Sequence, residues 1–109
     1  MNIVIYGAPG SGKTTYANEI REDEDVVFDL DAIAATLNPR FANFGDRPND
    51  IAWLILAFRE VLIKRHRNGM LGKRRIIVIV KREDQAKGIA RTLGAKLVCA
   101  SNVGSYEVV

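Results

Sequence analysis

The sequence predicts an α/β fold, a three-layer sandwich with a small parallel sheet, formed by a single domain over residues 1–109. Two observations predict it. Short apolar runs with β-branched residues alternate with segments of helical length, which is typical of parallel strands joined by right-handed crossovers. A glycine-rich turn at 7–12 joins the first strand to the first helix. The ligand site of such a sheet is expected at the carboxyl ends of its strands.

The strands are predicted from apolar runs that end at polar or glycine residues. The first run ends at Gly7 and is typical of a strand buried on both faces. The second run ends at Asp29, and the third is the most hydrophobic, which predicts a central place in the sheet. The expected strands are residues 2–6, 26–28, 75–80, 96–99 and, at an edge, 106–109.

The helices are predicted from apolar periodicity and from residues that start or stop a helix. Asp31 is expected to cap the second helix, and Asn49 or Asp50 the third. Gly94 is expected to end the fourth. The third helix is apolar around more than one face, which predicts packing within the core or at a subunit contact. The expected helices are residues 13–21, 32–37, 51–67 and 83–93.

Length and composition favour one globular domain: 109 residues, 48% hydrophobic and 27% charged. No apolar stretch approaches the ~20 residues that a membrane span needs. Met1 leads directly into an apolar strand, with no secretory leader. The single cysteine, Cys99, excludes an internal disulfide and is expected to be a half-buried thiol at a strand end. These features together predict a cytoplasmic protein.

The charge is mildly positive, +3 at neutral pH, but it is unevenly distributed. Basic residues cluster at 64–67, at 73–75 and at 81–82, and an acidic run occupies 22–25. Two interpretations stay open. The clusters could attract phosphates or nucleic acid, or they could form a solvated surface.

One segment matches the phosphate-binding pattern G-x-x-x-x-G-K-[ST] at every defined position: Gly7-Ala8-Pro9-Gly10-Ser11-Gly12-Lys13-Thr14. Its glycines allow successive N–H groups to turn inward as an anion cradle, above a helix N-terminus. Lys13 would reach the β- and γ-phosphates, Thr14 would bind Mg²⁺, and Thr15 would contact the α-phosphate. The segment therefore predicts binding of a nucleoside triphosphate with Mg²⁺.

Residues 7–15, followed by Val27-Phe28-Asp29-Leu30-Asp31-Ala32-Ile33, resemble the start of the P-loop kinases. They are similar to the small phage-type ATP-binding kinases and to the kinase domain of polynucleotide kinase. The resemblance covers residues 1–37. It implies a minimal kinase-like P-loop fold, ATP as the nucleotide, and phosphoryl transfer to a nucleoside, a nucleotide or a nucleic-acid end.

The resemblance also implies roles for two carboxylates. In the polynucleotide-kinase type, the acidic residue after the second strand is a general base for the acceptor hydroxyl. Asp31 is the best match by position, and Asp29 is the second. Asp29 is also a candidate partner, through water, for the Mg²⁺ that Thr14 binds. The alternative is that Asp31 only caps a helix and Asp29 only ends a strand.

The chain departs from the kinase pattern in three ways. The strand at 75–80 ends in Lys81-Arg82 rather than in an aspartate, and Ala34 stands where polynucleotide kinases have an arginine. The sequence ends at Val109, before an arginine-bearing lid. The charge of that lid would have to come from a neighbouring subunit or from cations of the chain itself: Lys81, Arg82, Lys87 or Arg91. An ATPase without a lid, a nucleotide-sensing module that controls a partner, and a nucleic-acid-associated NTPase therefore stay open beside the kinase.

The loop at 38–50 contains Arg40, Phe41, Phe44 and Arg47. In nucleotide kinases this region often holds the phosphate acceptor. The aromatic rings could stack on its base, and the arginines could hold its phosphate. The alternative is that both phenylalanines fold onto the core while the arginines face water.

Overall fold

The computed structural model describes residues 1–102 and 105–109. The chain divides into two compact units. The first contains Met1–Val27 and Lys73–Val109, and the second contains Phe28–Gly72. The second unit is thus an insertion between two segments of the first. Within the described residues, no helix combines the length and the apolar character that a membrane span requires.

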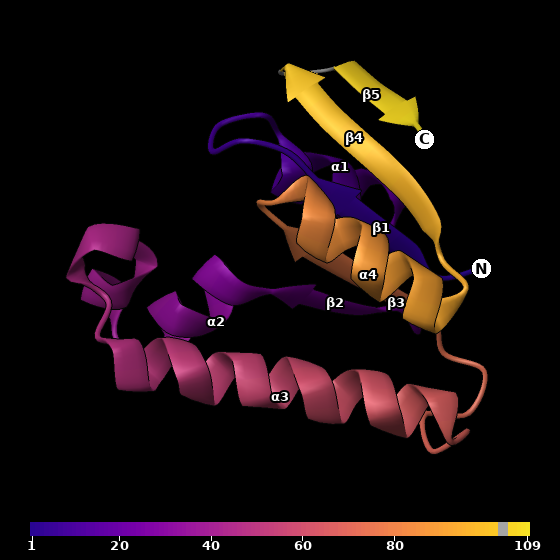
Figure 1. Ribbon diagram of the computed structural model, residues 1–109, viewed down its shortest axis with the longest axis horizontal. Coiled ribbons are helices and arrows are strands. Elements are labelled where there is room, and N and C mark those ends of the chain that lie inside the picture. The colour runs from indigo at the N-terminus through magenta and orange to yellow at the C-terminus, as the bar shows by residue number, and fades with distance from the viewer. Residues whose placement is uncertain (103–104) are drawn as a thin grey trace. The chain divides into compact units, whose positions relative to one another are not determined.

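The described residues form a five-stranded mixed sheet with the order β2-β3-β1-β4-β5. β1 pairs in parallel with β3 and β4, whereas β5 runs antiparallel to β4 (Figure 1). The predicted α/β class is confirmed. The prediction of a purely parallel sheet is wrong, because the last strand folds back along β4. The strands are β1 (Ile3–Tyr6), β2 (Val26–Asp29), β3 (Ile76–Val80), β4 (Lys96–Asn102) and β5 (Ser105–Val108).

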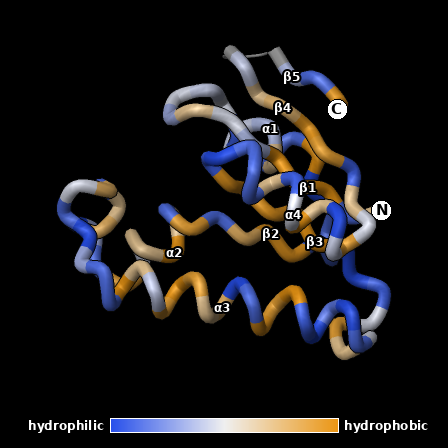
Figure 2. Tube along the Cα trace, in the orientation of Figure 1, coloured by the Kyte–Doolittle hydropathy of each residue, from blue (hydrophilic) through white to orange (hydrophobic). Residues whose placement is uncertain are grey.

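The core of the first unit follows the alternation of side chains along its strands. Helices α1 (Lys13–Ile20) and α4 (Glu83–Leu93) contact the sheet, α4 in front of β1 and β3 and α1 behind them (Figure 1). All residues of β1 and β3 are buried, and these strands are among the most apolar parts of the trace (Figure 2). Our placement of β3 at the centre is wrong, since β1 holds that position and β3 is its neighbour. The cluster beneath α1 contains Ile3, Ile5, Ala17, Ile77, Ile79, Val98 and Ala100.

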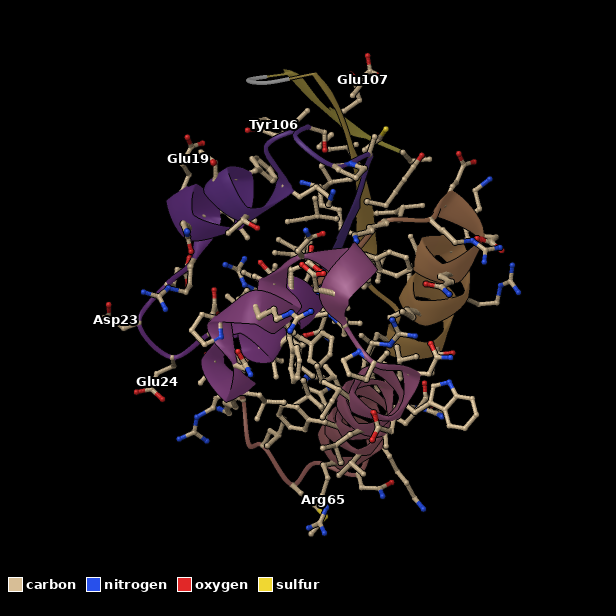
Figure 3. All side chains as sticks on the ribbon, turned by 90° about the vertical axis from the view of Figure 1, so that its left-hand side faces the viewer. Glu19, Asp23, Glu24, Arg65, Tyr106 and Glu107 are labelled. Atoms are coloured by element: carbon tan, nitrogen blue, oxygen red, sulfur yellow. The ribbon has the colours of Figure 1, made fainter. Side chains whose placement is uncertain are left out.

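Where the chain leaves and re-enters the first unit, two charged side chains form a half-buried ion pair. Arg75 Nε donates to Asp25 Oδ2 at 3.0 Å, and Arg75 Nη2 donates to Ile20 O at 2.9 Å. The guanidinium of Arg75 lowers the pKa of Asp25, against the opposing effect of burial. Arg74 pairs at the surface with Glu24, which projects from the loop before β2 (Figure 3). The second basic cluster is therefore neutralised in part by the acidic run at 22–25.

The second unit contains α2 (Leu30–Leu37), the 3₁₀ helices η1 (Pro39–Ala42) and η2 (Phe44–Asp46), and α3 (Asn49–Arg67). Asp29, not Asp31, is the N-cap of α2: its Oδ1 accepts from Asp31 N at 3.2 Å and from Ala32 N at 3.4 Å. The strand continues through Asp29, and α2 follows it directly at Leu30 rather than at residue 32 as predicted. Pro48 is the N-cap of α3, because Asn49 and Asp50 are already helical.

Helix α3 has one buried face and one exposed apolar face. Ile55, Leu62 and Ile63 are buried. The expectation that the helix packs within the core on more than one face is wrong, while the alternative of a subunit contact stays a prediction. A second set of large apolar side chains is exposed: Trp53, Leu54, Phe58 and Val61. The bounds of α4 are those that the sequence predicted. Gly94 ends this helix in the left-handed region at φ 61°.

Candidate phosphate-binding site

The loop between β1 and α1 begins with Gly7, a position where a side chain would not fit. A Cβ at Gly7 would lie 2.3 Å from Ala100 O and 2.6 Å from Ser11 Oγ. Gly7 is buried, while the next three residues, Ala8, Pro9 and Gly10, are exposed. The loop thus leaves the sheet beside β4 and extends toward solvent at the carboxyl end of β1.

Two further glycines give the loop the backbone conformation that leads it into α1. Gly10 and Gly12 have φ angles of 80° and 88°, in the region that favours glycine. Gly12 is the N-cap of α1, and in this fully described helix no side chain caps that end and no acidic residue lies in the first turn. The backbone N–H groups at the start of α1 are therefore not satisfied by a side-chain cap, and the helix dipole adds positive potential there. This is a local arrangement suited to an anion.

Lys13 folds back across the same loop. Its Nζ donates to Gly7 O at 2.7 Å and to Ala8 O at 2.9 Å. The ammonium is thus held against the carbonyl groups of the first two loop residues, which gives the loop a full positive charge.

Ser11 has a buried hydroxyl in this loop. The residue is 5% exposed. Among the described residues, no hydrogen-bond partner satisfies Ser11 Oγ. A buried polar atom without a partner is unusual in a folded protein. Here it lies in the same loop as the carbonyl groups that hold the Lys13 ammonium, one residue before the N-cap of α1.

The residues present fit a magnesium ion only as part of a complex with phosphate. Within the described part of the chain, no three His, Cys, Asp or Glu side chains gather as a metal cage. Mg²⁺ keeps several waters and takes one or two protein ligands together with substrate phosphates. Thr14 would be such a ligand. It and Thr15 are exposed at the start of α1, next to the loop.

The structure adds a residue that sequence reasoning missed. Tyr106, on β5, donates a hydrogen bond from its hydroxyl to Gly12 O at 3.2 Å. Its ring stacks on that of Tyr16 in α1, with centroids 4.2 Å apart and planes at 26°. The apolar run at 106–109 predicted only an edge strand. No local signal relates a residue near the end of the chain to the loop after β1.

A second pair of polar side chains lies at the carboxyl end of β1, where this strand pairs with β4. Tyr6 pairs with Cys99 across these strands. A hydrogen bond with Cys99, together with burial and the nearby Glu83, raises the pKa of Tyr6 to about 12. Cys99 is partly buried, as predicted, but it lies in the middle of β4 rather than at a strand end, because the strand continues to Asn102.

The two predicted carboxylates belong to the second unit. Asp29 caps α2 with Oδ1, and Asp31 Oδ1 accepts from Arg47 Nη2 at 2.8 Å. The side chain of Asp31 is 46% exposed, whereas that of Arg47 is only 2% exposed. Each carboxylate therefore has a structural partner within the second unit.

Arg47 forms hydrogen bonds within the loop at 38–50, which the sequence suggested as a site for the phosphate acceptor. Its Nε donates to Phe41 O at 2.9 Å, and its Nη2 donates to Ala42 O at 3.3 Å. The prediction that Arg47 faces either a ligand or water is wrong, because the side chain is buried among carbonyl groups. Phe44 is exposed and lies beneath the Arg47 guanidinium, 5.9 Å from ring centroid to Cζ. Arg40 is exposed, as one alternative predicted.

Two of the cations proposed to replace a lid have acidic partners on or beside α4. Arg82 forms two hydrogen bonds with Asp84, at 3.1 and 2.6 Å. Lys87 pairs with Glu83 one turn away, at 2.8 Å. Both pairs are exposed, so they hold these side chains only weakly.

Comparisons with known proteins gave no match to a family model, to a curated protein or to a solved structure.

Proposed function

We propose that residues 7–15 bind the phosphates of a nucleoside triphosphate, ATP with Mg²⁺, and that the chain is a kinase-like phosphotransferase. The observation that carries this proposal is the start of α1. A loop with three glycines, an ammonium and no side-chain cap combines charge and N–H donors in one place. That combination has no evident role in packing and suits a polyphosphate.

Each of these residues would have its own role in binding or in phosphoryl transfer. The N–H groups at the start of α1 and Lys13 would hold the phosphates and stabilise charge on the transferred group. Ser11 Oγ, buried without a partner, would offer a hydroxyl once the loop adjusts around an anion. Thr14 would bind the metal, which would neutralise phosphate charge. Asp31, or Asp29, would accept the proton of an acceptor hydroxyl.

A second candidate function is a module whose nucleotide state controls a partner. The ion pair between Asp31 and the buried Arg47 favours it, because this carboxylate already supports the fold of the second unit. The pairing of Arg82 and Lys87 with neighbouring acids favours it as well. The nucleic-acid-associated NTPase has less support, since Arg74 and Arg75 pair with Glu24 and Asp25.

The test is the fate of the γ-phosphate. The protein would be incubated with γ-labelled ATP and Mg²⁺ and a panel of nucleosides, nucleoside monophosphates, and DNA or RNA with free 5′ hydroxyls. Lys13→Ala removes the ammonium and is expected to weaken ATP affinity about 10- to 100-fold, as for a lost charge-assisted hydrogen bond. Asp31→Asn keeps an acceptor for Arg47 but removes the base, so it should abolish transfer while ATP binding persists.

Each outcome selects one function. Label on one acceptor, lost in Asp31→Asn, supports the phosphotransferase and names its substrate. Label in water only, or no turnover with ATP binding that depends on Lys13, supports the nucleotide-controlled module. An unchanged affinity in Lys13→Ala would overturn the proposed site altogether.

A further inference from the structure

We infer that Tyr106 is a positioning residue for the phosphate-binding loop, through a hydrogen bond that sets the orientation of the Gly12–Lys13 peptide. The inference rests on the proposed function and goes beyond it, because it assigns a role in nucleotide affinity to a residue of β5. All of the groups involved belong to the first unit.

Strand register brings Tyr106 to the loop. Ala100 on β4 pairs with Tyr106 on β5, and Ala100 O lies against Gly7 at the beginning of the loop. Tyr106 packs against the same core cluster as Tyr16 and Ile20 of α1. Figure 3 shows Tyr106 between β5 and α1, whereas the next residue, Glu107, points away from α1.

The contact acts on one peptide plane. Gly12 O accepts from Tyr16 N at 2.9 Å, the first hydrogen bond of α1, and from the Tyr106 hydroxyl at 3.2 Å. In a planar trans peptide the carbonyl and the following N–H point in opposite directions. Two donors on Gly12 O therefore direct the N–H of Lys13 away from Tyr106 and α1, toward the inside of the loop.

The fit at Gly12 is close. A Cβ at this position would lie 2.9 Å from the Tyr106 hydroxyl, so glycine is required by the approach of Tyr106 as well as by its φ of 88°. The stacked rings of Tyr16 and Tyr106 hold the hydroxyl in place. The C-terminal strand thus contributes a hydrogen bond to a loop that lies near the start of the sequence.

The test compares the two tyrosines of one ring stack, of which Tyr106 donates its hydroxyl to Gly12 O. Tyr106→Phe keeps the ring stack and removes the hydrogen bond to Gly12 O. Tyr16→Phe removes a hydroxyl from the other ring of the same stack and leaves Gly12 untouched. Glu107→Gln controls for a change on β5. The affinity of ATP·Mg²⁺ would be measured by calorimetry, and the thermal midpoint and the backbone amide spectra of Gly12 and Lys13 would be recorded without nucleotide.

We expect Tyr106→Phe to weaken ATP·Mg²⁺ binding about 3- to 10-fold, the effect of one lost hydrogen bond on the loop. The Gly12 and Lys13 amide signals should shift in Tyr106→Phe. Tyr16→Phe and Glu107→Gln should bind ATP·Mg²⁺ as the unaltered protein does. A purely structural role would lower the thermal midpoint of Tyr106→Phe and leave its nucleotide affinity unchanged.

The outcomes separate this inference from the function on which it rests. Unaltered protein that binds no ATP·Mg²⁺ overturns the proposed function, and the inference with it. If the unaltered protein binds and Lys13→Ala does not, but Tyr106→Phe binds equally well, only the inference is overturned. An equal loss of affinity in Tyr16→Phe and Tyr106→Phe also overturns it, since the effect would then come from the ring stack.

Discussion

The start of α1 in the first unit differs from the starts of three helices in the second. In the second unit, α2, η1 and η2 each begin with a side chain that accepts a backbone hydrogen bond: Asp29, Asn38 and Asn43. In the first unit, α1 begins at Gly12 with no side-chain cap. Helix α3 of the second unit also begins without a side-chain cap, at Pro48, so what distinguishes α1 is that its uncapped start follows the glycine loop at the carboxyl end of β1. Helix starts that look alike in a ribbon therefore differ in chemistry: three are capped by a side chain, and the start of α1 is the one that we propose for a ligand.

In the first unit, a half-buried ion pair and the proposed binding loop lie at opposite ends of the strands. Asp25 and Arg75 precede β2 and β3, whereas the glycine loop follows β1. We expect Asp25→Ala to lower the free energy of unfolding by about 3–5 kcal/mol, because it leaves the Arg75 guanidinium without its buried partner. Urea denaturation would measure this. The control is Glu24→Ala, whose pair with Arg74 is exposed and should be worth about 0–1 kcal/mol. Equal losses in the two variants would contradict the contrast.

The same pair predicts the pH dependence of stability. The pKa of Asp25 is lowered in the folded chain from its ordinary 3.8, so the folded state favours the ionised carboxylate. Its contribution to stability is complete above the unfolded pKa and is lost as the pH falls through the folded value. Unfolding free energies measured from neutral pH down to about pH 2 should fall less in Asp25→Asn than in the unaltered protein.

The glycines of the loop give the next largest effect. Gly12→Ala should destabilise the chain by about 1–2 kcal/mol from its positive φ alone, and the contact with Tyr106 adds to this. Gly10→Ala has a similar φ but nothing within 4 Å of its Cβ, so it controls for the backbone strain. Calorimetry should show weaker ATP·Mg²⁺ binding in Gly12→Ala than in Gly10→Ala. The reverse order would mean that the close approach of Tyr106 is unimportant.

Asp29 allows the cap and the proposed metal role to be separated. Asp29→Ala removes the cap of α2 and should cost about 1 kcal/mol of stability, whereas Asp29→Asn keeps a good cap. Thermal unfolding would measure this difference. If Asp29 also serves the metal, Asp29→Asn should keep its stability but show weaker Mg²⁺-dependent nucleotide binding. Unchanged nucleotide binding in a stable Asp29→Asn protein would mean that Asp29 serves only as a helix cap.

The smallest effect concerns a glycine outside the loop. Gly88 lies inside α4, and a Cβ there meets nothing within 4 Å. Gly88→Ala should therefore stabilise the chain by about 0.5–1 kcal/mol, since alanine loses less backbone entropy on folding. Thermal unfolding would detect the gain, and ATP·Mg²⁺ affinity should not change. A loss of affinity would show that α4 influences the loop.

The sequence predicted the features that contiguous residues determine. The strand, glycine loop and helix over residues 3–20 could be placed because the apolar run, the glycines and Lys13 occur together. The roles of Asp29 and Asp31 were harder to predict. Both residues are good N-caps and they lie two residues apart, so which of them caps α2 depends on where the strand ends. Tyr106 on Gly12, Arg47 on Asp31 and Arg75 on Asp25 could not be predicted, because each depends on how distant segments pack.

The ion pair of Asp25 and Arg75 has a consequence for how the chain can evolve. It closes the first unit at the two points where the inserted segment begins and ends. The entropy of closing a loop grows only slowly with its length, so the segment between them can lengthen, shorten or diverge with little penalty to the rest. Mutations that accumulate in Phe28–Gly72 would then alter this segment while the loop after β1 retains its architecture. A lineage of such chains should show strong divergence in the middle of the sequence outside Asp29 and Asp31, and little at Asp25, Arg75 and the glycine loop.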